Sequence, residues 1–213
     1  MTSAKPFLIA VVLTTAMGAA AMAAARIDFS DPRRALGRQD DIRVDAELGE
    51  DTLAANSPVT VTYQINNLSK STIAIADKVA DASFDPDSQT VTLSIGAEIP
   101  PGPNMPHLVL INSGQKRVLT AGALLHILVP TVRARFIPVP RYVQVKVTVL
   151  RDVTPFAKLV ERQSKSAVPV PLPNDMFDRW VNNSSSIFLN ALPVYWNGAR
   201  PSGVSAESSQ SGE

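Results

Sequence analysis

The sequence predicts an all-β protein whose strands form a sandwich or a barrel. Several stretches alternate apolar and polar side chains with the period of two that half-buried strands show. These stretches are rich in β-branched residues, which suit a pleated surface, and turn signals separate them about every ten residues. Prolines outnumber glycines by 17 to 10, and hydrophobic residues make up 45% of the chain against 18% charged. This composition is typical of a globular protein with many strand ends rather than long helices.

We expect about eight strands between Ile42 and Leu150. The clearest alternation lies in four runs, at residues 42–48, 59–65, 91–95 and 143–149. Shorter apolar runs complete the set, at residues 73–75, 108–111, 118–119 and 124–129. The runs 108–111 and 124–129 are almost continuously apolar, which indicates strands buried on both sides. Residues 112–115 predict a hairpin turn into 118–119. Residues 100–103 predict a loop, because proline cannot donate to a strand ladder.

Part of this strand pattern is similar to a known family. Residues 60–75 contain an alternating strand, an Asn-Asn pair, a short polar turn and a second apolar strand. This arrangement resembles the B–C region of bacterial extracytoplasmic immunoglobulin-like domains, and the turn at residues 111–116 resembles one that is common late in such domains. The resemblance implies an immunoglobulin-like β-sandwich and no particular activity. The chain lacks the cysteine pair and the core tryptophan of antibody-type domains, since Trp180 and Trp196 follow the last clear strand.

The N-terminus predicts export. Residues 1–25 carry one lysine, a short apolar core and small residues at the −3 and −1 positions of a cleavage site after Ala23 or Ala25, as a cleaved signal peptide does. The alternative is an uncleaved anchor, because residues 7–25 could just span a bilayer. The chain has no cysteine, which excludes a lipoprotein anchor, disulfides and thiolate metal sites. We therefore expect a secreted or periplasmic protein, in contact with a membrane only if the signal is retained.

The remainder of the chain predicts four further regions. Residues 26–41 are polar without an apolar period and indicate an extended N-terminal lead. Residues 42–154 form the predicted sandwich domain. Residues 155–197 comprise a Pro-rich connector and an aromatic arm, in which Asn174 is expected to cap a short helix. Residues 198–213 are rich in Ser, Gly and Glu and indicate a disordered tail.

The aromatic arm is the first candidate partner-binding segment. Contiguous apolar residues that follow a connector mark an interaction site unless they are buried at home. The arm could therefore seal one sheet of the sandwich or dock on another protein with its two tryptophans as anchors, and we slightly favour docking. The candidate binding residues of the arm are Met176, Phe177, Trp180, Phe188, Tyr195 and Trp196.

A basic cluster is the second candidate. Removal of the signal removes Lys5 from the 20 basic residues and leaves 19 against 19 acidic ones, yet residues 116–165 hold ten basic and two acidic residues. Two neighbouring strands joined by a turn at residues 138–140 would align the basic side chains on one ribbon. The ribbon is either a solvated sheet face or a site for an anionic surface. Nucleic acid is not expected, because few aromatic residues interleave with the charges. Its members are Arg133, Arg135, Arg141 and Lys146.

Local motifs for catalysis or cofactor binding are weak. The two histidines, His107 and His126, lack metal-site spacing and predict a loop histidine and a core histidine. Residues 85–88 offer alternating oxygen ligands but lack the glycine and glutamate of a calcium loop, so they predict a turn. There is no Gly-x-Ser-x-Gly elbow. We expect no catalytic residue, no metal and no cofactor.

These observations predict a non-catalytic exported module that binds or assembles with an envelope or secreted protein, as an accessory subunit of a cell-envelope or appendage system. One alternative is an exported hydrolase without a local motif, which would require a polar cleft that holds His107 or His126 beside a carboxylate. The other is a membrane-tethered domain that retains its N-terminal helix. The sequence leaves the partner, the pathway and the oligomeric state open.

Overall fold

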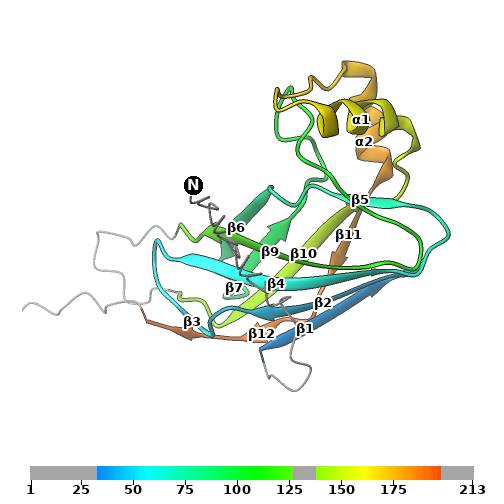
Figure 1. The fold of residues 1–213 in the computed structure, drawn as a ribbon. Coiled ribbons are helices and arrows are strands. Elements are labelled where there is room, and N and C mark those ends of the chain that lie inside the picture. The colour runs from blue at the N-terminus through cyan, green and yellow to red at the C-terminus, as the bar shows by residue number, and fades with distance from the viewer. Residues whose placement is uncertain (1–32, 127–137, 198–213) are drawn as a thin grey trace, which may run out of the picture.

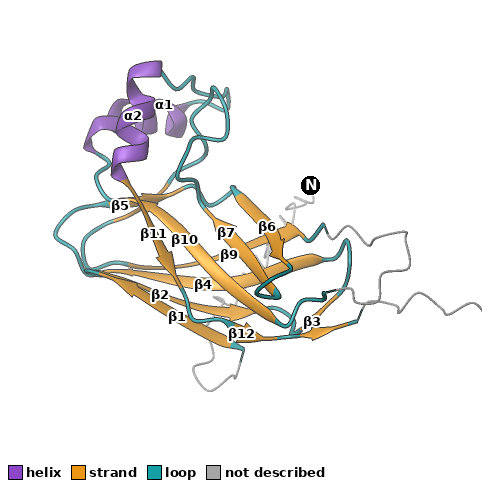
Figure 2. Cartoon of the chain, turned by 180° about the vertical axis from the view of Figure 1, so that it is seen from behind, coloured by secondary structure: helices purple, strands orange, loops and turns teal. Residues whose placement is uncertain are grey.

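The computed structural model describes residues 33–126 and 138–197, and in this part of the chain it confirms the predicted all-β sandwich. Two sheets pack face to face, and the helices gather at one end (Figures 1 and 2). The first sheet is antiparallel with the order β1-β2-β4-β9. Its strands are β1 (Arg34–Gln39), β2 (Ile42–Leu48), β4 (Pro58–Asn67) and β9 (Lys116–Leu124).

The second sheet is built around β10 (Tyr142–Leu150), which pairs in parallel with β7 (Thr90–Ile95) and antiparallel with its other neighbours. Those neighbours and the outer strands are β5 (Ile73–Ile75), β6 (Ala80–Asp85), β8 (Val109–Ile111), β11 (Ser184–Phe188) and β12 (Leu192–Pro193). A separate short pair joins β3 (Thr52–Leu53) to β13 (Tyr195–Trp196).

The core lies between the two sheets, and the alternation in the sequence correctly predicts which side chains fill it. Every second residue of β4 is buried, from Val59 to Ile65, and every second residue of β10 from Val143 to Val149. Burying one face of each sheet requires this period of two. The apolar runs at 42–48 and 73–75 coincide with β2 and β5.

The predicted N-terminal lead is wrong for residues 34–39, which form β1 along the whole of β2. The inward positions of β1 are the small residues Ala35 and Gly37, so the strand shows no apolar period. Gly37 is required because a Cβ there would lie 2.6 Å from the carbonyl oxygen of Phe188. Asn190 also ties β1 to the segment that follows β11. Its backbone N–H donates to Leu36 O at 3.1 Å, and its side-chain oxygen accepts a hydrogen bond from Leu36 N at 2.7 Å.

The arm is not a region outside the sandwich, so the predicted boundary after residue 154 is wrong. Strands β11 and β12 both pair with β10. The inward side chains of this segment belong to the main core, namely Ile187, Leu189, Leu192 and Val194. The arm therefore completes the second sheet, and the apolar character that suggested a docking segment is used largely inside the protein.

A helical cap covers one end of the sandwich (Figure 2) and has its own small core. Its members are a 3₁₀ turn at Thr154–Phe156, helix α1 (Ala157–Lys165) and helix α2 (Asn174–Asn183). Trp180 lies at its centre with 1% of its surface exposed. The Trp180 ring meets Phe156 edge-on at 5.6 Å between centroids, and its indole N–H donates to Ala97 O at 2.9 Å. Helix α2 begins at Asn174 after Pro173 with no side-chain cap, so the predicted asparagine cap is wrong.

The loops follow the prediction only in part. Residues 100–103 form a loop as expected, and the connector is tied to this loop because Leu172 N donates to Pro103 O at 2.8 Å. The turn at residues 112–115 is not a hairpin, since β8 pairs with β5 in the second sheet and β9 with β4 in the first. The predicted strand 124–129 is reduced to Leu124 at the end of β9, and residues 127–129 lie outside the described residues.

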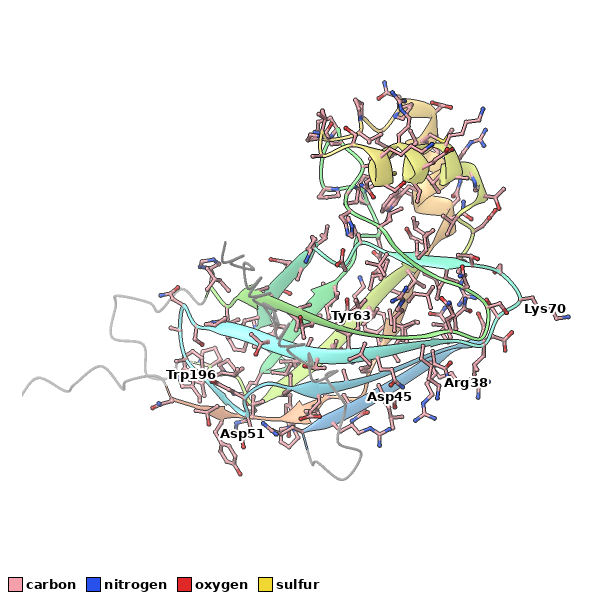
Figure 3. All side chains as sticks on the ribbon, viewed as in Figure 1. Arg38, Asp45, Asp51, Tyr63, Lys70 and Trp196 are labelled. Atoms are coloured by element: carbon pink, nitrogen blue, oxygen red, sulfur yellow. The ribbon has the colours of Figure 1, made fainter. Side chains whose placement is uncertain are left out.

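Tyr63 makes the core sensitive to alkaline pH. Its side chain is buried (Figure 3), and its hydroxyl has no hydrogen-bond partner among the described residues. Burial, and secondly the negative charge of Asp77, raise the pKa of Tyr63 far above its usual range. Because the folded pKa lies above the unfolded value near 10, the linked stability is full below about pH 10 and is lost as pH rises further.

We therefore expect the free energy of unfolding to fall by about 1.4 kcal/mol per pH unit above pH 10 through this group alone. The Tyr63→Phe variant should be at least as stable as the parent at neutral pH, because it removes an unpaired buried hydroxyl. It should also lose less stability between pH 10 and pH 11. Denaturant titrations of both proteins across this range measure the difference, and identical pH profiles would refute the assignment.

Candidate binding face

The structure describes only two of the four residues of the predicted basic ribbon, Arg141 and Lys146. Arg133 and Arg135 lie outside the described residues, so their part of the ribbon stays a prediction. Arg141 is exposed just before β10, where its N–H donates to Gln89 O at 2.9 Å. Lys146 lies on β10 itself, and its ammonium group is 2.9 Å from Glu98 Oε1. Lys146 is therefore neutralised within the protein and does not offer a free positive charge.

The arm residues divide between interior and surface. Trp180 cannot anchor a partner as predicted, because it is the buried centre of the cap. Met176 is half-buried against the same cluster. Trp196 is half-buried against the main core, at the end of the sandwich away from the helices (Figure 3). The remaining three aromatic side chains are exposed, namely Phe177 at 40%, Phe188 at 56% and Tyr195 at 72%.

The exposed aromatic residue Phe188 lies on the solvent-facing side of the second sheet. The strand registers place outward side chains of β6, β7, β10, β11 and β12 in three adjacent rows, which we call the outer face. Tyr142, 44% exposed, stands at one end and Phe188 at the other. The rows are Asp85, Thr90, Tyr142 and Pro193; Ser83, Thr92 and Gln144; and Asp81, Ser94, Lys146 and Phe188.

Lys146 and Phe188 form the best-ordered part of this face. The Lys146 ammonium lies 5.5 Å from the centroid of the Phe188 ring, within cation–π range. The Ser186 hydroxyl donates to the same Glu98 oxygen that pairs with Lys146. The hydrogen bond from Ser186, followed by the one from Lys146, lowers the pKa of Glu98 below its usual value. The carboxylate therefore stays ionised and keeps Lys146 beside the ring.

Gly96 explains how Glu98 reaches this position. It follows β7 with φ of +81°, and a Cβ there would collide with the carbonyl oxygen of Thr148. Only glycine fits both the left-handed conformation and the close approach to β10. The chain then turns across the end of the sheet and places Glu98 next to Lys146 and Ser186.

The opposite face, on the first sheet, carries an ion-pair cluster around Asp45. Asp45 on β2 (Figure 3) has 2% of its side chain exposed. It accepts hydrogen bonds from Arg34 at 2.7 Å and from Arg43 at 2.9 Å. A shallow depression of about 400 Å³ lies on this sheet, and none of its lining residues titrates near neutral pH. The lining residues are Gly49, Thr60, Val61, Thr62, Thr120, Ala121 and Gly122.

The predicted hydrolase alternative requires a histidine beside a carboxylate within a polar cleft, and His107 meets only the first of these two requirements. His107 is exposed, and its Nδ1 lies 2.7 Å from the carboxylate of the largely buried Asp77. The depression described above is elsewhere, on the first sheet. In the described part of the chain, no hydroxyl hydrogen-bonds the His107 ring, so the pair lacks a positioned nucleophile. His126 is exposed, and the prediction of a core histidine is wrong.

The acidic turn at residues 85–88 is closed by its own hydrogen bonds, as predicted. Asp85 accepts from the Ser88 hydroxyl at 2.6 Å and from Asp87 N at 3.1 Å. These bonds, with Ser88 the larger contributor, lower the pKa of Asp85. Among the described residues, no three His, Asp or Glu side chains come together as a metal site.

No protein-family model, curated protein or solved structure matches this chain. Within residues 33–126 and 138–197, neither helix is long and apolar enough to cross a bilayer. The family resemblance and the export of the protein therefore stay predictions. The outer face is identified as a candidate site only from the positions of its side chains.

Sequence reasoning found Lys146 and Phe188 but missed the residues that complete the face. Tyr142, Thr90 and Thr92 were visible as the polar positions of alternating strands, where they count only as solvent-facing. Glu98 and Ser186 carry no local signal, because neither belongs to a motif and their positions depend on how distant segments pair.

Proposed function

We propose that this protein is a non-catalytic binding or assembly module of the cell envelope or the secreted space, and that it engages its partner through the outer face. One observation carries the proposal. Tyr142 and Phe188 stand exposed on β10 and β11, while their neighbours Val143 and Ile187 are fully buried in the core. Both rings are thereby held in fixed positions on a rigid sheet.

Two physical arguments support a binding role for this arrangement. Exposed aromatic side chains are the commonest anchors of binding sites, since they bury a large area with few rotatable bonds. Anchors that are already ordered lose little conformational entropy when a partner arrives. Function by surface contact also agrees with an extracytoplasmic sandwich, whose export the N-terminal sequence predicts.

The Tyr142→Ala/Phe188→Ala double variant tests the proposal. We expect it to fold with a melting temperature close to that of the parent, because both side chains are largely exposed. We also expect it to lose the partner that the parent retains after cross-linking in its native envelope. Tyr195→Ala is the matched control, since Tyr195 is an exposed aromatic residue of β13, outside the outer face. Retention of the partner by the double variant and its loss from the control would place the site on the arm's end instead.

A further inference from the structure

The outer face consists mainly of polar side chains. Of the eleven side chains in its three rows, Pro193 is the single aliphatic one, and five carry hydroxyl groups. Among the described residues, the side chains of Ser83, Thr92, Ser94 and Asp81 form no recorded hydrogen bond. These side chains are donors and acceptors that have no hydrogen-bond partner within the described part of the protein.

The two aromatic rings lie along one side of these polar residues, because Tyr142 is on β10 and Phe188 on β11, whereas the polar side chains are on β6 and β7. Tyr142 and Lys146 are four residues apart on β10, and Phe188 is the cross-strand neighbour of Lys146. Four residues of strand extend about 13 Å. Gln144 lies between the two rings and is fixed by its bond to Leu189 O at 3.3 Å. A ligand that contacts both rings must therefore be elongated, apolar at intervals and polar between them.

The charges within the three rows disfavour an anionic ligand. Lys146 is the only cation in the three rows and already pairs with Glu98 at 2.9 Å. Asp81 and Asp85 are exposed carboxylates on β6. With Lys146 paired, the charged side chains of the three rows sum to a negative charge, which disfavours nucleic acid and anionic lipid, whose binding depends on unpaired lysine and arginine.

Composition also disfavours a protein partner at this face. The centres of protein interfaces are depleted in Ser, Asp and Lys, and these residue types make up five of the eleven side chains in the three rows. The same side chains favour a ligand that carries hydroxyl groups, because a hydroxyl group can both donate a hydrogen bond to and accept one from Ser, Thr, Asp and Gln side chains as each requires.

We infer that the outer face binds an uncharged oligosaccharide. The C–H faces of two separate sugar rings would lie on Tyr142 of β10 and on the side of the Phe188 ring away from Lys146. The hydroxyl groups between the two sugar rings would pair with Gln144, and with Thr92 and Ser94 on the adjacent strand β7. The inference rests on the proposed binding function of this face and adds the chemical class of the ligand. It also assigns Glu98 the task of holding Lys146 away from solvent, so that the face carries no attraction for anions.

The test is titration calorimetry of the purified protein against neutral glucans, xylans and chito-oligosaccharides of increasing length. We expect affinity to rise with chain length until the ligand reaches both rings. Tyr142→Ala and Phe188→Ala should each weaken binding roughly tenfold, the effect of about 1.4 kcal/mol. Thr92→Val keeps the shape and the β-branching but removes the hydroxyl, and should weaken binding several-fold. Phe177→Ala, an exposed aromatic substitution on α2, should leave binding unchanged.

Salt separates this ligand class from an anionic one. Affinity for a neutral glycan should be constant between low and high ionic strength, whereas binding to an anionic polymer weakens as salt rises. Absence of binding to all the neutral glycans, or binding that both ring substitutions leave intact, overturns the inference. If the double variant of the previous section still loses a protein partner in that case, the binding function stands and the assigned ligand class is wrong. If it loses none, both fail.

Discussion

Truncation after Pro173 should abolish folding rather than release a peripheral arm. The truncation removes α2 and the strands β11 and β12, which pair with the central strand β10. It also removes Trp180 and the four arm residues of the main core, Ile187, Leu189, Leu192 and Val194. The four aliphatic side chains alone contribute roughly 6–12 kcal/mol by burial, which is comparable with the net stability of roughly 5–15 kcal/mol of a whole domain.

Circular dichroism and thermal melting of the truncated protein measure this result. The expected outcome is loss of the cooperative transition. A shorter truncation after Asn197 is the matched control, because it leaves every described element in place, and it should melt like the parent. A cooperative melt of the Pro173 truncation near the parental temperature would show instead that the sandwich folds without the arm.

Trp180→Ala should be the most damaging single substitution in the helical cap. It removes the largest buried side chain, the edge-on contact with Phe156 and the hydrogen bond to Ala97 O. Substitution of a buried tryptophan by alanine typically costs 3–5 kcal/mol, since a cavity is left as well. For a chain of this length, the melting temperature should fall by roughly 6–20 °C.

Two further variants separate the loss of the hydrogen bond from the loss of the buried ring and provide an exposed control. Trp180→Phe keeps an aromatic ring but leaves Ala97 O without its donor, so its melting temperature should lie between those of the parent and the alanine variant. Phe177→Ala lies on the exposed side of the same helix and should change stability by no more than about 0.5 kcal/mol. Equal losses for Trp180→Ala and Phe177→Ala would contradict the burial that we describe.

The sequence predicted the strands whose alternation is strong and failed where the inward residues are small or hydroxylic. β2, β4, β7 and β10 carry Val, Ile or Leu at inward positions, so their period is visible. β1 and β6 place small residues such as Ala35, Gly37 and Ala82 toward the core. β11 begins with three serines and has one apolar inward residue, Ile187. These segments are strands because their neighbours pair with them.

The candidate site shows the same division at the level of single residues. The sequence identified Lys146 and Phe188 as candidate binding residues from charge and aromatic character, which are properties of their own segments. Lys146 contacts Phe188, which lies 42 residues further along the chain, and pairs with Glu98, which lies 48 residues before it. No local pattern encodes such distances.

The sequence by itself therefore determined the fold class, most strand positions and the absence of disulfides, because side-chain period, turn residues and cysteine content are local properties. The tertiary structure decided that the aromatic arm completes the second sheet and that Trp180 is core. It also decided that the outer face is polar, with two exposed rings along one side and its single lysine paired. These features depend on which distant surfaces fit together when the core closes, and that choice is made by packing and strand register rather than by any single segment.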